Sequence, residues 1–474
     1  MRSWGVVALI ALGTGLALVI FGLWSGRFGA GIGLVSSSGG VITLDPGIRY
    51  QTITGWEATS QAGQTFPEWS SYGDTLIEWA VDDLGINRLR LEIRSGAESD
   101  ADYFSQFESG QIDHGAWKNI RYATANDNDD PDVINWAGFH FTDLDQTIEA
   151  VVIPMKERLE ARGEKLYVNL TYVAFTHNMT PGYRYIHADP EEYAEFVFAT
   201  YLHMQREYGF VPDAWEVILE PDNRVEQWNG AVIGRAILAA ASKLEANGFT
   251  PRFIAPSTTN MSASLQYFDD MAKVLGPAGV SKYVSEISYH RYRGVSDRSL
   301  RDIAGRAKQY GINTAMLEHI GSGYEALHQD LKVGNNSAWQ QFTLAFPTKD
   351  NGAQYYFIDN SNRGNRQVKM GNRTRFLRQY FKYVRAGAQR IEASSDDGDF
   401  DPVAFVNQDG RFVLVVKASS GGTFSVDGLP AGRYGTFYTT GSQYDVSTPE
   451  ITLAGGSLLN ASIPSGGVIT VYQK

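Results

Sequence analysis

Short apolar runs alternate with longer amphipathic stretches through most of this chain of 474 residues. Apolar runs bounded by turn residues predict buried strands, and apolar residues spaced three or four apart predict helices. The predicted strands are 54–59, 86–93, 165–173, 214–220, 252–257, 285–292, 313–319 and 353–359. The predicted helices are 74–84, 143–162, 190–208, 231–247, 264–275, 298–310, 324–346 and 373–386. Strands and helices alternating in series predict an α/β fold, a (β/α)8 TIM barrel over residues 54–387.

From residue 388 the helical periodicity ends and short alternating runs separated by Gly, Ser and Pro turns follow. This pattern predicts a C-terminal antiparallel β-sandwich side domain over residues 388–474. Residues 41–53 form two similar short runs around Pro46 and Gly47. We expect these N-terminal strands to join the side domain.

The N-terminus carries an uncharged, mostly apolar stretch from Trp4 to Trp24, preceded by Arg2. Its length suits a bilayer-spanning helix of roughly 20 residues. Residues 1–24 are therefore predicted to be a transmembrane signal anchor, with a cleaved signal peptide as the alternative. Residues 25–40 are rich in Gly and Ser and predict a tether. Either alternative predicts an exported protein, membrane-anchored or secreted.

The composition and charge of the chain argue against several classes of function. The formal net charge of -12 argues against nucleic acid as a partner, because phosphates require a basic surface. The chain has no cysteine, which excludes disulfides and thiolate metal sites. No histidine pair has zinc spacing and no phosphate-binding loop is present, so no metal and no cofactor are expected. The aromatic content of 12% suits either a carbohydrate cleft or a large core.

Two glutamates end predicted barrel strands. Glu220 ends the fourth strand and Glu318 ends the seventh. Active sites of such barrels lie at the C-terminal ends of the strands. Strand alternation predicts that Ile218 shares a face with Glu220, and Met316 with Glu318. If both faces point into the barrel, the two carboxylates meet at its mouth, where such a pair supports glycoside hydrolysis.

Glutamates at the ends of strands four and seven resemble the acid/base and nucleophile pattern of the clan A retaining glycoside hydrolases. The segment Tyr50–Ala58 contains Gln-Thr-Ile-Thr-Gly-Trp. It is similar to the Gln-x-Ile-x-Gly-Phe-Gly segment that begins the barrel in glycoside hydrolase family 30, and the chain as a whole is distantly similar to that family. Ser288–Tyr292 resembles the clan's His-x-Tyr on strand six, and Arg88–Leu91 resembles its strand-two arginine segment. The resemblance covers residues 41–474.

This resemblance implies a β-glycosidase acting on a carbohydrate substrate, with Glu220 as acid/base and Glu318 as nucleophile. It further implies that Arg90 orients Glu318, with Arg88 on the same strand face as the alternative partner. His290 and Tyr292 would hydrogen-bond the nucleophile or the substrate, although His290 also suits a core position. We expect the closeness of the two carboxylates to raise one pKa and keep the acid protonated.

Two positions depart from the family pattern. Leu219 stands where the clan usually has an asparagine that hydrogen-bonds the sugar 2-hydroxyl. Glu57 stands where the family tends to have a small residue, and it suits either a sugar subsite or a solvated loop. The alternatives are therefore a clan A enzyme of different anomeric specificity, or a non-catalytic carbohydrate-binding or structural barrel.

Further subsite candidates are aromatic side chains, each of which also suits a core position: Trp56, Tyr172, Tyr289, Tyr355 and Tyr356. A long insertion, Ser95–Thr142, follows the second strand on the catalytic side and is expected to shape a cleft. Trp117, Tyr122 and Trp136 lie within it. The insertion also contains the oxygen-rich loop 126–132, which predicts a solvated loop or, alternatively, a structural calcium site.

Overall fold

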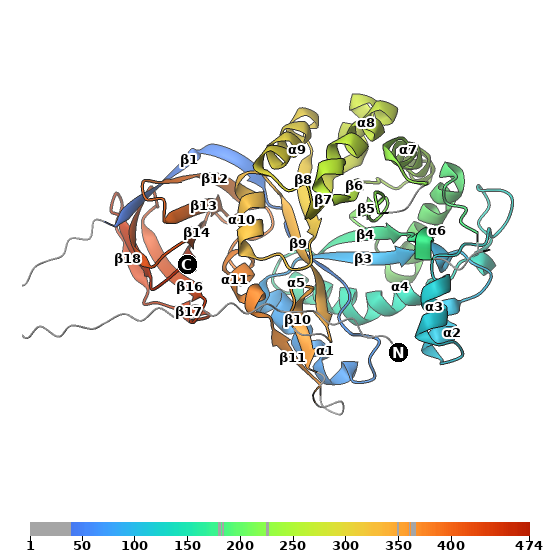
Figure 1. The fold of residues 1–474 in the computed structure, drawn as a ribbon, viewed down its shortest axis with the longest axis horizontal. Coiled ribbons are helices and arrows are strands. Elements are labelled where there is room, and N and C mark those ends of the chain that lie inside the picture. Colours follow the sequence, from blue (N-terminus) through green and yellow to red (C-terminus); the bar gives the residue numbers. More distant parts are fainter. Residues whose placement is uncertain are drawn as a thin grey trace, which may run out of the picture. The chain divides into compact units, whose positions relative to one another are not determined.

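Eight parallel strands close into a barrel in the middle of the chain (Figure 1). Their order follows the sequence, and β9 pairs with both β2 and β8, which closes the sheet. The barrel strands are β2 (Gly55–Thr59), β3 (Arg88–Arg94), β4 (Tyr167–Val173), β5 (Ala214–Glu216), β6 (Phe253–Asn260), β7 (Val284–Arg293), β8 (Asn313–Glu318) and β9 (Ala338–Phe346). The predicted (β/α)8 barrel is thus confirmed.

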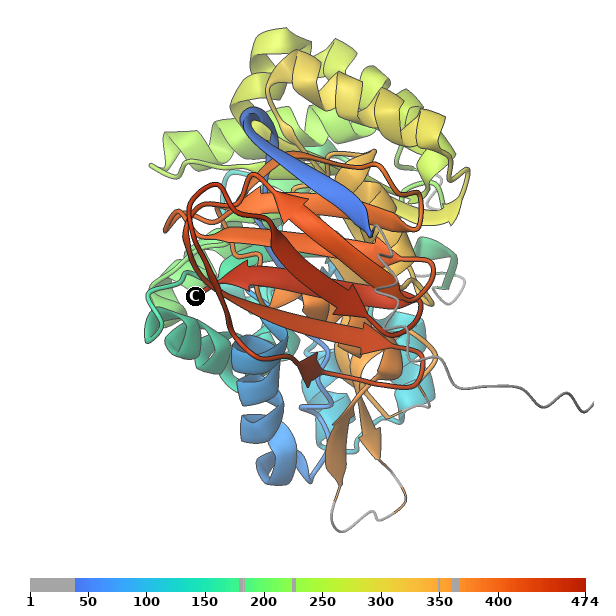
Figure 2. The same cartoon turned by 90° about the vertical axis from the view of Figure 1, so that its left-hand side faces the viewer.

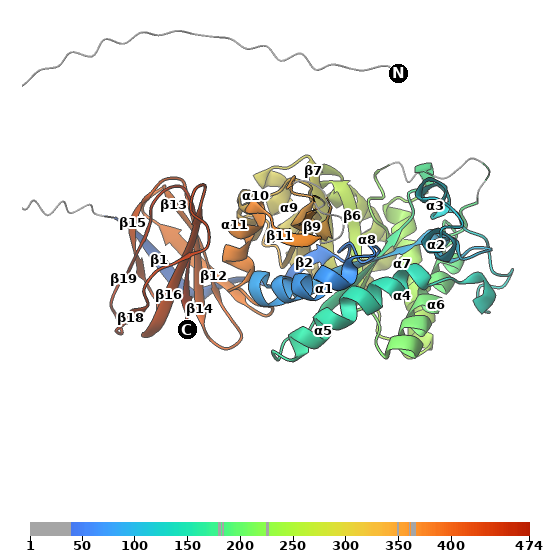
Figure 3. The same cartoon turned by 90° about the horizontal axis from the view of Figure 1, so that it is seen from below.

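Helices follow the barrel strands, and most of them cover the outside of the barrel (Figure 3). They are α1 (Trp69–Glu78), α2 (Tyr103–Glu108), α3 (His114–Ile120), α4 (Thr142–Thr147), α5 (Ile153–Glu160), α6 (Pro190–Tyr208), α7 (Gly230–Ala246), α8 (Met261–Tyr283), α9 (Asp297–Tyr310), α10 (Tyr324–Lys332) and α11 (Asn372–Phe381). Several of these helices begin with a capping residue. At the start of α6, for example, the Asp189 side chain accepts a hydrogen bond from the Glu191 amide, and Pro190 occupies the first turn.

The computed structural model describes residues 39–178, 182, 184–223, 227–347, 350–359, 361 and 366–474. The predicted anchor at 1–24, and the predicted tether up to residue 38, lie outside these residues. Within the described part of the chain, none of the helices has both the length and the hydropathy that crossing a bilayer requires.

The eighth barrel strand was predicted in the wrong place. Residues 338–346, predicted as the end of a helix, form β9, whereas the predicted strand 353–359 forms β10 (Gln354–Asp359). β10 continues the sheet beyond the barrel, parallel to the end of β9 and antiparallel to β11 (Gln367–Met370). Nearly all of β9 is buried, so it lacks the alternation of a half-exposed strand, and its Ala and Gln residues favour helix.

A second sheet of ten strands forms the C-terminal domain (Figure 2). Its strands are β1 (Gly40–Thr52), β12 (Gln389–Ser395), β13 (Phe400–Val406), β14 (Phe412–Ala418), β15 (Gly422–Asp427), β16 (Gly432–Thr440), β17 (Val446–Ser447), β18 (Ile451–Leu453), β19 (Leu459–Ile463) and β20 (Gly467–Gln473). β1 pairs antiparallel with β12 and parallel with β15, so the N-terminal strand is built into this sheet. The domain has its own apolar core, including Phe424, Leu459 and Ile469.

Helix α11 connects the barrel to this sheet. The Gln379 side chain donates to Thr439 Oγ1 at 3.0 Å, and its backbone carbonyl accepts from Thr470 Oγ1 at 2.7 Å. Just beyond the helix, Tyr383 stacks on Tyr472 with ring centroids 4.1 Å apart. These contacts fix the sheet against the side of the barrel at α11.

Candidate active site

Buried charges fill much of the barrel interior, in place of the usual branched apolar side chains. Arg88 donates from Nε to Glu57 at 2.6 Å, and from Nη1 and Nη2 to the two oxygens of Glu286 at 2.7 and 2.9 Å. All three side chains are buried. Burial raises the pKa of Glu57, although the charge of Arg88 opposes the rise. Glu57 was proposed as a subsite residue or a solvated carboxylate; it is neither, because it is an internal partner of Arg88.

Arg90 lies one step nearer the mouth on the same face of β3. Its Nη2 donates to Glu318 Oε2 at 2.7 Å, and its Nη1 donates to the Leu317 carbonyl at 2.7 Å. Burial would lower the pKa of Arg90, but the charges of Glu216 and Glu318 outweigh it and raise that pKa. Of the two strand-two arginines, Arg90 is therefore the partner of Glu318.

Glu318 reaches the mouth through an irregularity that simple alternation did not predict. Met316 packs in the core outside the barrel, whereas Leu317 lies in the small apolar cluster that includes Ala315. The pairing of β7 with β8 shifts register so that His290 lies opposite Glu318. The Leu317 carbonyl, which accepts from Arg90, also accepts from Gln340 Nε2 at 2.7 Å. These bonds hold the shifted strand end with Glu318 turned inward.

Glu220 is also positioned by irregular backbone. β5 ends at Glu216 rather than at the predicted residue 220, and Ile218 packs in the core outside the barrel. The Leu219 amide donates to the Tyr172 carbonyl at 2.9 Å, and the Glu220 amide donates to the Ser257 carbonyl at 3.0 Å. Glu220 has a φ of 50°, which non-glycine residues seldom adopt. The segment after β5 is thus held between β4 and β6 with Glu220 directed to the mouth.

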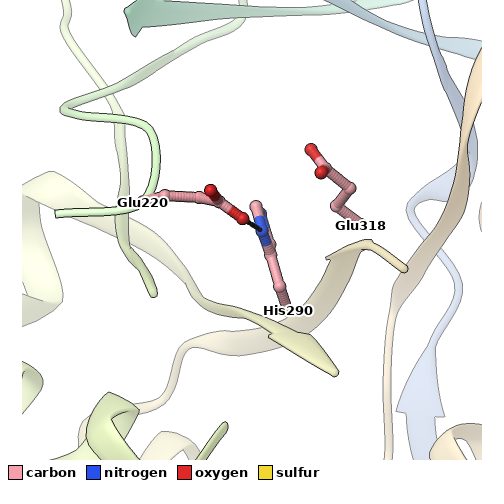
Figure 4. A group of neighbouring side chains, drawn as sticks. All are labelled: Glu220, His290 and Glu318. Carbon is pink, nitrogen blue, oxygen red and sulfur yellow. Dashed lines mark hydrogen bonds and ion pairs between the residues drawn. The ribbon is translucent and has the colours of Figure 1, made fainter. Parts of the chain in front are cut away.

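Glu220, His290 and Glu318 converge at the C-terminal ends of the strands (Figure 4). One carboxylate oxygen of each glutamate and one ring nitrogen of His290 all lie within 4.8 Å of one another. His290 Nδ1 lies 2.9 Å from Glu220 Oε1, and His290 is fully buried. Glu220 and Glu318 are 6% and 7% exposed, so the carboxylates are mostly shielded from water.

The contact between His290 and Glu220 sets the protonation of the free site. Burial would lower the pKa of His290, but the charge of Glu318 and the bond to Glu220 raise it. Burial would raise the pKa of Glu220, but the hydrogen bond and charge of His290, with a bond from Asn223, lower it. The predicted rise in the acid's pKa is therefore wrong for the free protein, because the contact with His290 lowers the pKa of Glu220 instead.

Tyr292 completes the surroundings of Glu318. Its hydroxyl donates to Glu318 Oε1 at 3.0 Å, opposite the oxygen that Arg90 holds. Burial and the Glu318 charge raise the pKa of Tyr292, so its hydroxyl stays a donor. Both oxygens of Glu318 thus accept from fixed donors, which fixes the orientation of the carboxylate.

The aromatic side chains predicted as subsites lie away from the mouth, fully buried. Trp56 stacks on Phe381 and donates to the Val384 carbonyl, outside the barrel. Tyr172 faces α6 and bonds His187 and Tyr185. The subsite prediction is therefore wrong and the alternative core position is confirmed for all five side chains, which are packed in the hydrophobic core: Trp56, Tyr172, Tyr289, Tyr355 and Tyr356.

Two contributing residues were missed. Asn223 Nδ2 donates to Glu220 Oε2 at 3.0 Å, and Gln340 supports the Leu317 carbonyl. Asn223 lies only three residues after Glu220, so a polar side chain in the turn that follows the strand was the available signal. Gln340 was hidden because its strand was predicted as helix.

The insertion 95–142 forms α2 and α3 beside the strand ends. Trp117 lies on α3, and Tyr122 packs against Leu219 next to Glu220. Trp136 lies apart, with the Arg206 guanidinium 4.6 Å above its ring. Leu219 is only 4% exposed, and its side chain is apolar at a position where the family pattern has an amide.

A metal site is offered by one group alone among the residues that the structure describes: Glu220, His290 and Glu318. Their ligand atoms already bond within the site, and the Arg90 guanidinium on Glu318 opposes a cation there. The loop 126–132, predicted as solvated or as a calcium site, is exposed at Asn126, Asp129, Asp130 and Asp132, as a solvated loop would be, and Asp127 accepts from the Asn135 amide at 2.5 Å.

Residues 387–470 match the β-sandwich domain of glycosyl hydrolase family 30. No curated protein matches the sequence. The solved structures similar to this chain include a GH30 endoxylanase from Clostridium papyrosolvens C71, with 17% identity and a TM-score of 0.63 over 91% of this chain and 99% of that one. The catalytic domain of GH30 xylanase C from Talaromyces cellulolyticus has 15% identity and a TM-score of 0.66 over 92% and 100%.

A glucosidase from Croceicoccus marinus is also similar, with 12% identity and a TM-score of 0.59 over 92% of this chain and 99% of that one. These identities are low, so the likeness is one of fold. The barrel and β-sandwich of this chain thus have the fold seen in GH30 enzymes, its C-terminal domain matches that family's β-sandwich, and the chain is distantly similar to glycoside hydrolase family 30.

Proposed function

We propose that this protein is a retaining glycoside hydrolase that cleaves β-glycosidic bonds in a polysaccharide or glycoconjugate. The observation that carries the proposal is the spacing of Glu220 and Glu318, whose carboxylate oxygens approach within 4.8 Å. Retaining enzymes separate their two carboxyl groups by about 5–5.5 Å, whereas inverting enzymes need about 6.5–9.5 Å to admit a water. The fold and the GH30 neighbours support the same class of reaction.

In the first step, a Glu318 oxygen attacks the anomeric carbon and forms a glycosyl ester as the bond to the leaving oxygen breaks. Glu220 gives its proton to that oxygen. Because the raised pKa of His290 and the lowered pKa of Glu220 favour the proton on His290 in the free site, the proton crosses the 2.9 Å contact to Glu220 first. Replacing water by a neutral sugar favours this transfer, because the transfer converts a buried pair of charged groups into two neutral groups.

In the second step, Glu220 takes a proton from water while the water oxygen attacks the anomeric carbon and releases Glu318. In the free site, Arg90 and Tyr292 hold the two oxygens of Glu318 at 2.7 and 3.0 Å. A fixed nucleophile avoids reorganisation during the reaction, which is a main source of enzymatic rate enhancement.

The side chains available to bind the sugar differ from those of the family. Leu219 cannot hydrogen-bond a 2-hydroxyl, and it is packed against Tyr122 and Val173. The neighbours include xylanases and a glucosidase, so the fold serves more than one substrate. The sugar bound by this protein is therefore sought by screening β-linked glycosides rather than taken from a relative.

We also propose that the protein is exported and stays membrane-anchored through residues 1–24, or is secreted after their cleavage. The support is the apolar stretch from Trp4 to Trp24, which is long enough for a spanning helix. Fractionation of cells that express the full chain tests this proposal. Recovery from the membrane fraction supports the anchor, a shortened soluble product outside the cell supports cleavage, and retention in the cytoplasm refutes export.

The catalytic assignment is tested with aryl β-glycosides and the variants Glu318→Ala and Glu220→Ala. Glu318→Ala should abolish turnover, and azide should restore turnover to Glu220→Ala by attacking the glycosyl-enzyme. Glu245→Ala removes a carboxylate from the far end of α7 and serves as the control. NMR of the first-formed product should show retained configuration; inversion, or full activity of either active-site variant, would refute the proposal.

A further inference from the structure

A cleft of about 320 Å³ opens beside the candidate active site, between the ends of β2 and β3 and helices α2 and α3. Its lining includes Gln61, Glu92, Arg94, Trp117, Arg121 and Phe346. Phe346 is 43% exposed and forms an apolar rim, while amide, carboxylate and guanidinium groups converge inside. An apolar wall with a few converging polar groups is typical of ligand pockets of this size.

The cleft adjoins the catalytic residues through two short paths. On β3, Arg90 holds Glu318, and Glu92 and Arg94 follow on the same strand and line the cleft. On the other side, the Arg121 guanidinium lies 4.9 Å from the ring centre of Tyr122, whose ring packs against Leu219. A chain of sugars bound at the catalytic carboxylates could therefore extend into this cleft.

The two arginines of the cleft differ in their partners. Arg94 is neutralised, because it donates to Glu92 at 2.9 Å and also pairs with Asp143. Arg121 forms neither a salt bridge nor a side-chain hydrogen bond with any residue that the structure describes, and its Nε is buried without a partner. Its guanidinium lies 4.9 Å from the ring centre of Trp117.

An unpaired and partly buried guanidinium is costly. Burial lowers the pKa of Arg121 and the charge of Arg94 adds to that effect, although Tyr122, Glu92 and Asp143 oppose it. The aromatic faces of Trp117 and Tyr122 hold the group in place but do not satisfy its hydrogen-bond donors. The remaining donors are available to a ligand, and planar N–H pairs bind oxyanions best.

We propose that this cleft is a subsite for a sugar that carries an oxyanion, and that Arg121 recognises the anionic group. This inference rests on the proposed glycosidase function, of which it specifies the substrate class. The two sources of the oxyanion are a uronic acid and a sulfate ester. Because the whole chain has a net charge of -12, an anionic sugar needs such a local cation to bind.

Direct binding tests this inference without relying on turnover. The full chain carrying Glu318→Gln is titrated with D-glucuronate, D-glucose 6-sulfate and D-glucose, and ligand binding is followed by NMR. We expect one of the two anionic sugars to bind at least about 10-fold more tightly than glucose, because a hydrogen bond between two charged groups is stronger than one between neutral groups. A preference for glucuronate identifies a carboxylate, and a preference for the sulfate identifies a sulfate ester.

Arg121→Gln, added to the Glu318→Gln background, should abolish that preference and leave glucose binding unchanged. Arg298→Gln removes a highly exposed arginine of α9 and should leave the preference intact. If Arg121→Gln does not fold, Arg121→Lys keeps the charge and should lose most of the preference, because an ammonium cannot form two parallel bonds. Equal binding of all three sugars, or a preference that survives loss of Arg121, would overturn the subsite. Since binding is measured in a variant that cannot turn over, an absence of hydrolysis in the wild type would refute only the glycosidase proposal.

Discussion

Replacing His290 with glutamine is expected to move the alkaline limb of the kcat/KM–pH profile to lower pH. The glycosylation step needs one proton on the pair formed by Glu220 and His290, which lie 2.9 Å apart. In the wild-type protein the raised pKa of His290 keeps that proton in the site above the ordinary imidazole value of about 6.5. Without the imidazole, the only carrier left is the Glu220 carboxyl.

The size of the shift follows from the hydrogen bond that is lost. A hydrogen bond to a charged group contributes about 1.5–3 kcal/mol, and one pKa unit corresponds to about 1.36 kcal/mol. The alkaline limb should therefore fall by about 1–2 pH units in His290→Gln. Because the carboxyl no longer competes with imidazole for the proton, kcat/KM at acidic pH should be maintained or increased.

The assay is the hydrolysis of an aryl β-glycoside below KM, from acidic to alkaline pH. His203→Gln is the control, since that histidine lies on the outer helix α6 and bonds Asp145 rather than either glutamate. Its alkaline limb should coincide with that of the wild type. An unchanged limb in His290→Gln would show that the imidazole does not hold the catalytic proton, and the protonation scheme would fail.

Four other predictions concern the same barrel. The pair of Glu220 and His290 should stabilise the fold most between about pH 4.3 and 6.5, the ordinary values. The lowered pKa of Glu220 stabilises the fold, and this stability is lost as pH falls through the pKa of Glu220 in the folded protein. The raised pKa of His290 also stabilises the fold, and this stability is lost as pH rises through the pKa of His290 in the folded protein. Both effects are measured by subtracting the Tm of His290→Gln from the wild-type Tm at each pH. Arg88→Met should lower the free energy of unfolding in urea by about 3–5 kcal/mol, because it leaves Glu57 and Glu286 buried without their cation; a loss below about 1 kcal/mol would mean that the interior is hydrated. Tyr292→Phe should reduce kcat by about 10-fold with little change in Tm, and an equal loss of stability would indicate a structural role instead. Leu219→Asn should cost about 1–3 kcal/mol of stability without raising kcat, because the new amide is buried in an apolar contact; a higher kcat would show that the amide reaches the sugar.

The barrel could be predicted because each strand and helix repeats a pattern that depends only on neighbouring residues. The same reasoning failed at β9, where burial on both faces removed the alternation and left the helix propensity of Ala and Gln as the stronger signal. It also could not foresee that the predicted aromatic subsites face the helices, because the inward face of a strand depends on its register in the closed sheet.

The candidate site shows what local sequence patterns can predict and what they cannot. The order of the strands placed Glu220 and Glu318 at one end of the barrel, as expected. Regular alternation would nonetheless have turned one or both away, and it is the register shift before Glu318 and the φ of 50° at Glu220 that bring them together. The pairing of Glu220 with His290, and the free guanidinium of Arg121, depend on contacts between distant segments that no local pattern encodes.

The left-handed backbone at Glu220 has a consequence for any effort to evolve this protein. Such a conformation costs a non-glycine residue on the order of 1–3 kcal/mol, and glycine would relieve it. Outside the pH range in which the contact with His290 stabilises the fold, Glu220→Gly should therefore fold at least as stably as the wild type while losing the acid/base. A library screened for heat resistance alone would enrich inactive variants at this position, so a screen must demand turnover and stability together.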